Sequence, residues 1–428
     1  MLNNFTKIFK SQTAKNGVWL YIFQFFNLII PLITIPYLSR VLSQESNGIF
    51  NSALNITAYL EMVVAYGFDL MGAKKISISS KEEIPKIYTG IFFSKLFFMG
   101  ISFVVMSVMT LGFKFPVENY LLMGIMFTLV IGTMLQHNWL FQGLQKMKFV
   151  TITNVITKSL SVLCIFLLIK KPDQYLLYSF LYCITFLLTG VISTIIIKYG
   201  FKIRLEKFSF SQMKKEIIDS FHTFLTSAMS KIYSGIAVTV LIIFTNDDIV
   251  GGFSMVYKLP LVTVMMFSPI FQTVFPFLSK KYNESFDSGY SLVKKMVKII
   301  MPLAILGCAI LAVFSKPIVS LVLGEDYISY HNILLPLSIW VILSIFNNFL
   351  GIQILVASGH PQKYSFSFLF GFITILICCP LFGYLWGPVG VSYGTMIAEA
   401  MLTIICTIMI IKTRKELNYE KSNVDIRN

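Results

Sequence analysis

Two lysines, Lys231 and Lys258, lie deep inside long apolar segments of this chain. One face of the helix expected around Lys231 is polar, because hydroxyl side chains recur there at helical spacing: Thr223, Ser227 and Ser234. A lysine near the middle of a bilayer is costly, and such residues normally face a protein interior or a water-filled cavity. The pair therefore predicts a cationic, solvated chamber that would attract an anion.

Polar residues follow the same helical spacing in other apolar segments. Lys158 shares a face with Asn154, and like the other two lysines it lies too deep for its stem to reach the headgroups. The chamber is predicted to be lined by Lys231, Lys258, Lys158, Arg40, Asn51, Asn55, Asn154, Ser227 and Ser234. For the hydroxyls and amides alone, hydrogen bonding between helices explains the pattern equally well.

Two acids, Glu61 and Glu399, also fall within apolar segments. Each either pairs with a buried lysine or stays protonated, or it is a coupling site for a proton or a sodium ion. Lys95 lies nearer the end of its segment and is interpreted as snorkelling to the membrane surface. His137 is interpreted as an interfacial residue at the end of its segment.

The composition places the chain among helical membrane proteins. Hydrophobic residues make up 56% of its 428 residues and charged residues only 13%, too little charge for a soluble protein of this size. A spanning helix needs about 20 apolar residues. Twelve segments meet this need, at 15–38, 47–68, 88–112, 118–142, 149–169, 175–198, 218–244, 249–276, 295–315, 331–356, 364–385 and 388–411. The predicted class is an all-α polytopic membrane protein.

The net charge of +15 reflects topology and indicates no nucleic-acid partner. Most lysines and arginines fall in alternate loops and at both ends of the chain, as the positive-inside rule requires of cytoplasmic segments. This distribution predicts an even number of spans and both termini in the cytoplasm.

The sequence contains no signature of an enzyme, a metal site or a cofactor site. All six cysteines lie within apolar segments and none has the spacing of metal ligands. A phosphate-binding loop of the P-loop type and H-E-x-x-H are absent from the sequence. We therefore expect no enzymatic activity, no metal and no cofactor.

The chain carries signs of an internal repeat. Glu45, Gly48 and Phe50 open one apolar segment with the same spacing as Asp248, Gly251 and Phe253 open a later one. The long polar interval near residue 200 divides the twelve segments six and six. This predicts an N-terminal lobe at 1–198, a cytoplasmic linker at 199–217, a C-terminal lobe at 218–412 and a cytoplasmic tail at 413–428. Internal repeats with a site at their interface are typical of transporters.

Four stretches resemble bacterial polysaccharide repeat-unit flippases, the O-antigen (Wzx-type) family. They are residues 36–42 (PYLSRVL), 48–50 (GIF), 66–70 (YGFDL) and 139–147 (WLFQGLQKM). The second half of the chain resembles the family by its pattern of spans. This family belongs to an exporter superfamily with lipid II flippases and MATE drug exporters. The resemblance implies twelve transmembrane helices in two six-helix lobes around a central cavity, as in MATE proteins, in the bacterial plasma (inner) membrane.

The resemblance also implies a substrate, an undecaprenyl-pyrophosphate-linked oligosaccharide repeat unit that crosses the membrane by alternating access. A pyrophosphate is an anion of the kind that buried lysines attract. The implied partners are this lipid-linked glycan, membrane lipids, a coupling proton or sodium ion, and a polysaccharide polymerase or glycosyltransferase. The identity of the sugar and the energy source stay open.

Two other functions compete with a flippase. A multidrug antiporter for organic cations would line its cavity with carboxylates, whereas three lysines and two acids lie near the midplane of the predicted spans here. A membrane glycosyltransferase or polymerase would need a large outer loop with catalytic acids, and the predicted outer loops are short.

Overall fold

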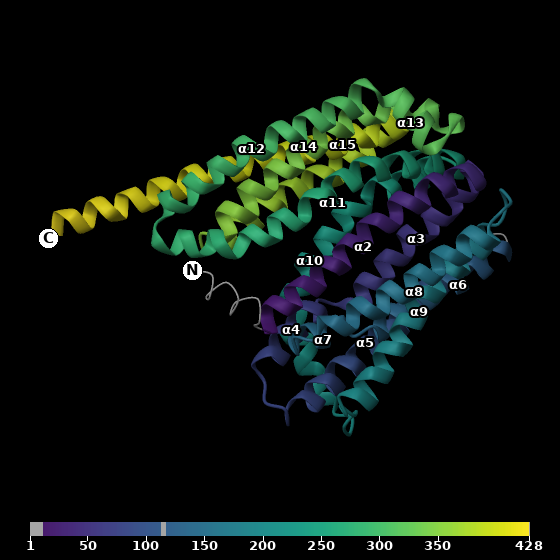
Figure 1. Cartoon of the computed structure of the whole chain (residues 1–428), viewed down its shortest axis with the longest axis horizontal. Coiled ribbons are helices and arrows are strands. Elements are labelled where there is room, and N and C mark those ends of the chain that lie inside the picture. The colour runs from purple at the N-terminus through teal and green to yellow at the C-terminus, as the bar shows by residue number, and fades with distance from the viewer. Residues whose placement is uncertain (1–11, 113–116, 428) are drawn as a thin grey trace. The chain divides into compact units, whose positions relative to one another are not determined.

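The computed structural model describes residues 12–112 and 117–427, and within them the secondary structure is helical (Figure 1). The chain divides into two compact units, Met1–Gly235 and Ile236–Asn428. The predicted lobes end and begin elsewhere, at residues 198 and 218. The polar interval and the first part of the following helix belong with the first unit.

The first unit contains nine helices and most of a tenth in the part described. These are α2 (Gln12–Val41), α3 (Gln44–Ala65), α4 (Phe68–Ile78), α5 (Ile84–Gly112), α6 (Val117–Leu135), α7 (Asn138–Gly143), α8 (Met147–Leu168), α9 (Tyr175–Ile195), the short π-helix η1 (Ile196–Gly200) and α10 (Phe210–Phe244). Helices α6 and α9 pack closely. Gly132 and Gly190 permit this approach, because a Cβ atom on either would lie 2.5 Å from backbone atoms of the other helix.

The second unit follows from the end of α10. Its helices are α11 (Asp247–Glu284), α12 (Phe286–Val313), α13 (Ser315–Leu323), η2 (Glu325–Ile333), α14 (Leu334–Asn347), η3 (Asn348–Val356) and α15 (Pro361–Arg427). Helix α14 packs against α11, α12 and α15. Gly387 has non-helical backbone angles within α15, between the two apolar segments predicted at 364–385 and 388–411.

Ten helices of the described residues are long and apolar enough to cross a membrane. The chain is therefore a multi-pass membrane protein, as its composition predicted. The tenth of these, Pro361–Leu417, contains two of the predicted segments, and α3 is not among the ten. The count of twelve spans and the two six-helix lobes stay predictions.

The repeated sequence pattern corresponds to the same local structure in both units. Ser43 caps α3 by accepting a hydrogen bond from the Ser46 amide, and Asn246 caps α11 by accepting one from the Ile249 amide. In each helix an acidic residue, a glycine and a phenylalanine lie at equal distances after the cap. Both phenylalanines are buried. The acids suit the positive end of the helix dipole.

The stretches 66–70 and 139–147 meet at one end of the first unit. Helix α4 packs against α7 (Figure 1), and their shared cluster includes Phe68, Trp139 and Phe141, each at most 1% exposed. Gly143 allows this approach, because a Cβ atom there would lie 2.6 Å from Ile76. The aromatic residues of these two stretches therefore form a packed core.

Contacts with α3, α4 and α5 hold the first part of α10 in the first unit. The ring of Tyr66 is stacked between Phe98 of α5 and Phe224 of α10, with centroids 4.2 and 4.4 Å away. The next residue, Gly67, has φ +73°, and a Cβ atom there would lie 2.7 Å from the backbone nitrogen of Phe224. Further along, Asn55 and Tyr59 of α3 face Gly235 of α10.

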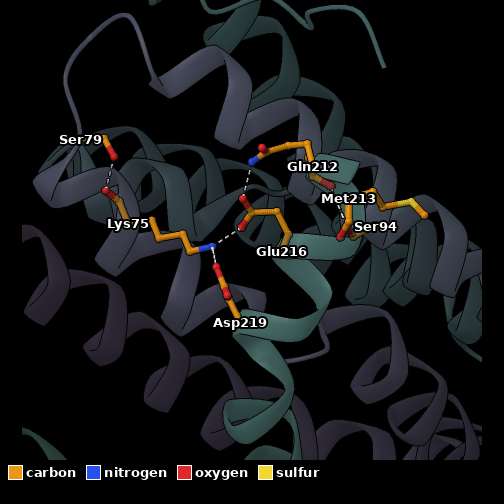
Figure 2. A network of polar contacts seen from close by, with 8 residues as sticks. Lys75, Ser79, Ser94, Gln212, Met213, Glu216 and Asp219 are labelled. Carbon is orange, nitrogen blue, oxygen red and sulfur yellow. Dashed lines mark hydrogen bonds and ion pairs between the residues drawn. The ribbon is translucent and has the colours of Figure 1, made fainter. Parts of the chain in front are cut away.

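A buried ion pair adds to this attachment (Figure 2). The Lys75 ammonium of α4 lies 2.6 Å from a Glu216 carboxylate oxygen and 2.7 Å from one of Asp219, both on α10. The other Glu216 oxygen accepts a hydrogen bond from Gln212. The Glu216 side chain is only 2% exposed, so its charge depends on these partners. We call these four residues the Lys75 network.

The Lys75 ammonium keeps its proton at neutral pH. Burial lowers the pKa of Lys75, but hydrogen bonds and charges from Asp219 and Glu216 together outweigh it and raise the pKa above its ordinary value. A raised lysine pKa stabilises the folded state at neutral pH, and this contribution is lost only as the pH rises through the raised value.

Replacing Gly67 by alanine is expected to loosen α10. The left-handed backbone angle costs an alanine about 1–2 kcal/mol, and the new methyl group would clash with the α10 backbone. The midpoint of thermal unfolding in detergent should fall. Gly100→Ala is the matched control, because a Cβ atom at Gly100 meets nothing within 4 Å. Equal midpoints for the two variants would contradict this account of the close approach.

Lys75→Met should lower the free energy of unfolding by about 3 kcal/mol, because it leaves the Glu216 carboxylate buried without its counter-charge. Thermal unfolding in detergent measures this. The control is Lys281→Met, which breaks the exposed pair with Glu284 and should cost less than about 1 kcal/mol. If Lys75→Met is no more destabilising than the control, the network does not hold α10.

Candidate functional site

An open groove runs along one face of α10 within the first unit. It has a volume of about 660 Å³ and is lined by Leu70, His222, Thr223, Thr226, Ser227, Ser230, Lys231 and Ser234. Seven of the eight come from α10 at helical spacing, and Leu70 comes from α4. We call this cavity the α10 groove. Within the part of the chain that the structure describes, Lys231 is the only lysine, arginine, aspartate or glutamate that lines it.

Several groove hydroxyls donate their protons to the helix that carries them. Thr226 donates to the His222 carbonyl at 3.0 Å, and Ser230 to the Thr226 carbonyl at 3.0 Å. Ser234 donates to the carbonyl of Lys231 at 2.9 Å. A hydroxyl has one proton and two lone pairs. These three oxygens therefore face the groove as hydrogen-bond acceptors.

A second cavity of about 420 Å³ adjoins the α10 groove and shares Leu70, Ser227 and Lys231 with it. Its charged lining residues are Glu61, Asp69, Lys95 and Lys231, and its amide side chains are Gln136 and Asn138. We call this cavity the ion-pair pocket. The Lys95 ammonium lies 2.8 Å from the Asp69 carboxylate, and the side chain of Lys95 is 5% exposed.

The lining of the ion-pair pocket contains two acids and two lysines. Lys95 is matched by Asp69 in direct contact. Lys231 is attracted by Glu61 but has no carboxylate oxygen within 4.0 Å among the described residues. The half-buried Lys231 is therefore the ammonium available to a ligand in either cavity.

The structure brings Lys231, Ser227, Ser234 and Glu61 together, and it places other predicted lining residues within the packed helices of the first unit. Asn51 and Asn154 are 7% and 5% exposed, and their amides donate to carbonyls one turn earlier in their own helices. Neither lines the two cavities. Their place in a larger chamber stays a prediction.

Lys158 and Arg40 also lie outside both cavities. The Lys158 ammonium of α8 donates to the Asn27 amide oxygen of α2 at 2.6 Å. It lies 5.9 Å from the ring centres of Phe23 and Phe186, within the range of a cation–π contact. Arg40 is exposed at the end of α2.

Asn55 of α3 faces Gly235 of α10 and lines neither cavity. The last two predicted residues belong to the second unit. The half-buried Lys258 of α11 has its ammonium 3.2 Å from the sulfur of Met255. Glu399 of α15 is 5% exposed, and a carboxylate oxygen accepts a hydrogen bond from the Asn347 amide at 3.0 Å. Neither lines the two cavities described above.

One sequence-based interpretation is wrong. Lys95 does not snorkel, because its side chain is 5% exposed and its ammonium pairs with Asp69. His137 is 2% exposed and its ring contacts that of Tyr88, and its placement at the membrane interface stays a prediction. The sequence shows an acid in the stretch 66–70 and a lysine in the next apolar segment, but it does not show that the two side chains pair.

The described residues hold no group of three or more histidines, cysteines, aspartates or glutamates that could bind a metal ion. The six cysteines are free thiols, four buried and two half-buried.

Known proteins resemble this chain over almost all of its length. A family model described as "Polysaccharide biosynthesis protein" matches residues 13–282. A protein of Escherichia coli (strain K12) named "Putative O-antigen transporter" is 24% identical over 411 residues, which cover 95% of this chain and 99% of that protein.

Two solved structures share the fold. The lipid II flippase MurJ in an inward closed conformation is 17% identical with a TM-score of 0.70, over 92% of this chain and 87% of that chain. A multidrug resistance MATE family transporter of the MOP superfamily, in its inward-facing conformation, is 15% identical with a TM-score of 0.62, over 92% and 99%. The fold is therefore MATE-like.

Water access to the α10 groove can be tested with single cysteines in a background whose six native cysteines are alanine. Ser230→Cys is expected to react with a water-soluble maleimide in membranes opened on both sides, because Ser230 is exposed in the groove. Thr157→Cys, at a position 5% exposed between α8 and α9, should not react.

A second control separates water from lipid. Ser107→Cys lies among exposed apolar side chains, with Val104 and Val108 60% and 65% exposed, so lipid should shield it from the maleimide. If Ser107→Cys is labelled at the rate of Ser230→Cys, exposure on the protein surface explains the reaction, and water in the α10 groove does not.

Proposed function

We propose a function for this chain, which belongs to the polysaccharide biosynthesis protein family: it is a flippase for lipid-linked oligosaccharide repeat units. Its substrate is an undecaprenyl-pyrophosphate-linked oligosaccharide, which it moves from the cytoplasmic to the outer leaflet of the bacterial plasma membrane by alternating access. A relative named for O-antigen transport and a MATE-like fold support the proposal.

The observation that carries the proposal is the Lys231 ammonium in a hydroxyl-lined groove. Between Asp219 and the end of α10 the helix has no other lysine, arginine, aspartate or glutamate, so the Lys231 charge needs water or an anion. A pyrophosphate supplies the anion, and the glycan next to it supplies groups that hydrogen-bond to the hydroxyls. Lysine is a compact point charge on a flexible stem, which suits a phosphate that must bind and then leave.

The orientation and the energy source belong to the same proposal. The distribution of the basic loops predicts that both termini lie in the cytoplasm. Glu61 is the candidate for coupling to a proton or a sodium ion, because it shares the ion-pair pocket with Lys231. Glu399 is the second candidate, in the other unit, where Asn347 already holds it.

One observation favours the competing function, an antiporter for organic cations. Glu61 and Asp69 line the ion-pair pocket, and carboxylates attract cations. Asp69 is already paired with Lys95 at 2.8 Å, which weakens this reading. Efflux of a cationic dye driven by an ion gradient, abolished by Glu61→Gln, would establish the antiporter and overturn the flippase.

Lys231→Ala is expected to abolish most of the transport. A hydrogen bond to a charged group contributes about 1.5–3 kcal/mol, so the rate should fall at least about 10-fold. The measurement is surface polysaccharide in a bacterium that makes the repeat unit but lacks its own transporter, at equal levels of inserted protein. Lys231→Arg, which keeps the charge, should retain part of the activity.

The matched control is Lys316→Ala, which removes an exposed lysine outside both cavities and should transport as the wild type does. A wild-type amount of surface polysaccharide with Lys231→Ala would contradict the proposal, because the proposal rests on the Lys231 ammonium.

A further inference from the structure

The lining of the α10 groove favours one class of glycan in addition to a pyrophosphate. We propose that the α10 groove selects an uncharged, hydroxyl-rich glycan beside the pyrophosphate and discriminates against repeat units whose sugars carry carboxylates. This inference rests on the proposed function and names the class of glycan that the same site accepts.

The first argument is the direction of the hydrogen bonds. The hydroxyl protons of Thr226, Ser230 and Ser234 are committed to backbone carbonyls of α10. Their oxygens can only accept from a ligand while these bonds persist. The hydroxyls of a neutral sugar and the amide of an N-acetyl group are donors, and they match these acceptors. A carboxylate is acceptor-only, so it would face lone pairs without a proton between them.

The second argument is the charge around the groove. Lys231 is the one full positive charge that lines it within the described residues, and the pyrophosphate already requires that charge. The adjoining pocket presents the carboxylates of Glu61 and Asp69, of which the second is 59% exposed. A sugar carboxylate would find no second cation to pair with in the groove, because the Lys95 of the adjoining pocket is already paired with Asp69.

The third argument is the shape of the groove. Its lining residues extend from His222 to Ser234 along α10, about 18 Å at the rise of an α-helix. The volume of about 660 Å³ falls within the range of about 300–1,000 Å³ that takes a small organic ligand. The groove is therefore long enough for several sugar rings in a row.

The test uses the full chain reconstituted in liposomes with two synthetic substrates. One is undecaprenyl pyrophosphate bearing a disaccharide of N-acetylglucosamine and glucose, and the other has glucuronic acid in place of glucose. The wild type should move the neutral substrate at least about 10-fold faster, a ratio equivalent to one or two hydrogen bonds. Equal rates, or faster transport of the acidic substrate, would overturn this inference and leave the proposed function standing.

Two variants test the cause of the selectivity. Thr226→Val with Ser230→Ala removes two acceptors, and it should slow the neutral substrate about 10-fold while the acidic one changes little. Ser230→Lys adds a cation to the groove and should shift the ratio of rates toward the acidic substrate. An unchanged ratio with Ser230→Lys in a protein that still transports would contradict the role assigned to the groove.

The matched control is Thr407→Val. Thr407 is an exposed threonine of α15 whose hydroxyl likewise donates to the carbonyl one turn earlier, but it lies outside the groove. It should leave both rates unchanged. Failure of the wild type to move either substrate would refute the proposed function itself, which is a different result from a loss of selectivity.

Discussion

An ammonium group inside an apolar helix must be paired with an anion, held by dipoles or hydrated, because the free energy of an unsatisfied charge in such surroundings is prohibitive. The first unit meets this constraint in three different ways. Lys95 is paired with Asp69, and Lys158 is held by the Asn27 amide between two aromatic rings. Lys231 instead lies where two cavities meet, without a carboxylate in contact. Since only the third arrangement leaves the charge available, the functional proposal depends on it.

Helix α10 links this constraint to the rest of the fold. It carries seven of the eight groove residues, Lys231 among them, and its orientation decides which of its faces lines the groove. The first unit holds it through the Tyr66 stack, the close approach at Gly67 and the Lys75 network. These contacts lie on the N-terminal side of Lys231 or next to the groove. The packing that fixes α10 therefore also sets the geometry of the site.

The family resemblance in residues 66–70 and 139–147 has a structural explanation. Their aromatic side chains form the core between α4 and α7, while Asp69 of the first stretch and Asn138, which directly precedes the second, line the ion-pair pocket. One short stretch thus supplies both a packed face and a polar face. This explains how motifs that look like packing signals come to border the candidate site.

The sequence by itself determined the class of protein and the residue on which the site is centred. Apolar segments of spanning length can only be satisfied as helices in a membrane, and the hydroxyls spaced around Lys231 predicted its polar face. Only the tertiary structure decided which polar residues meet. Asp69 and Lys95 are 26 residues apart, and their pairing depends on how α4 turns back at Gly67 against α5. Asn51 and Asn154 show the converse, because helical spacing places residues on one face of a helix but does not say whether that face meets a cavity or another helix.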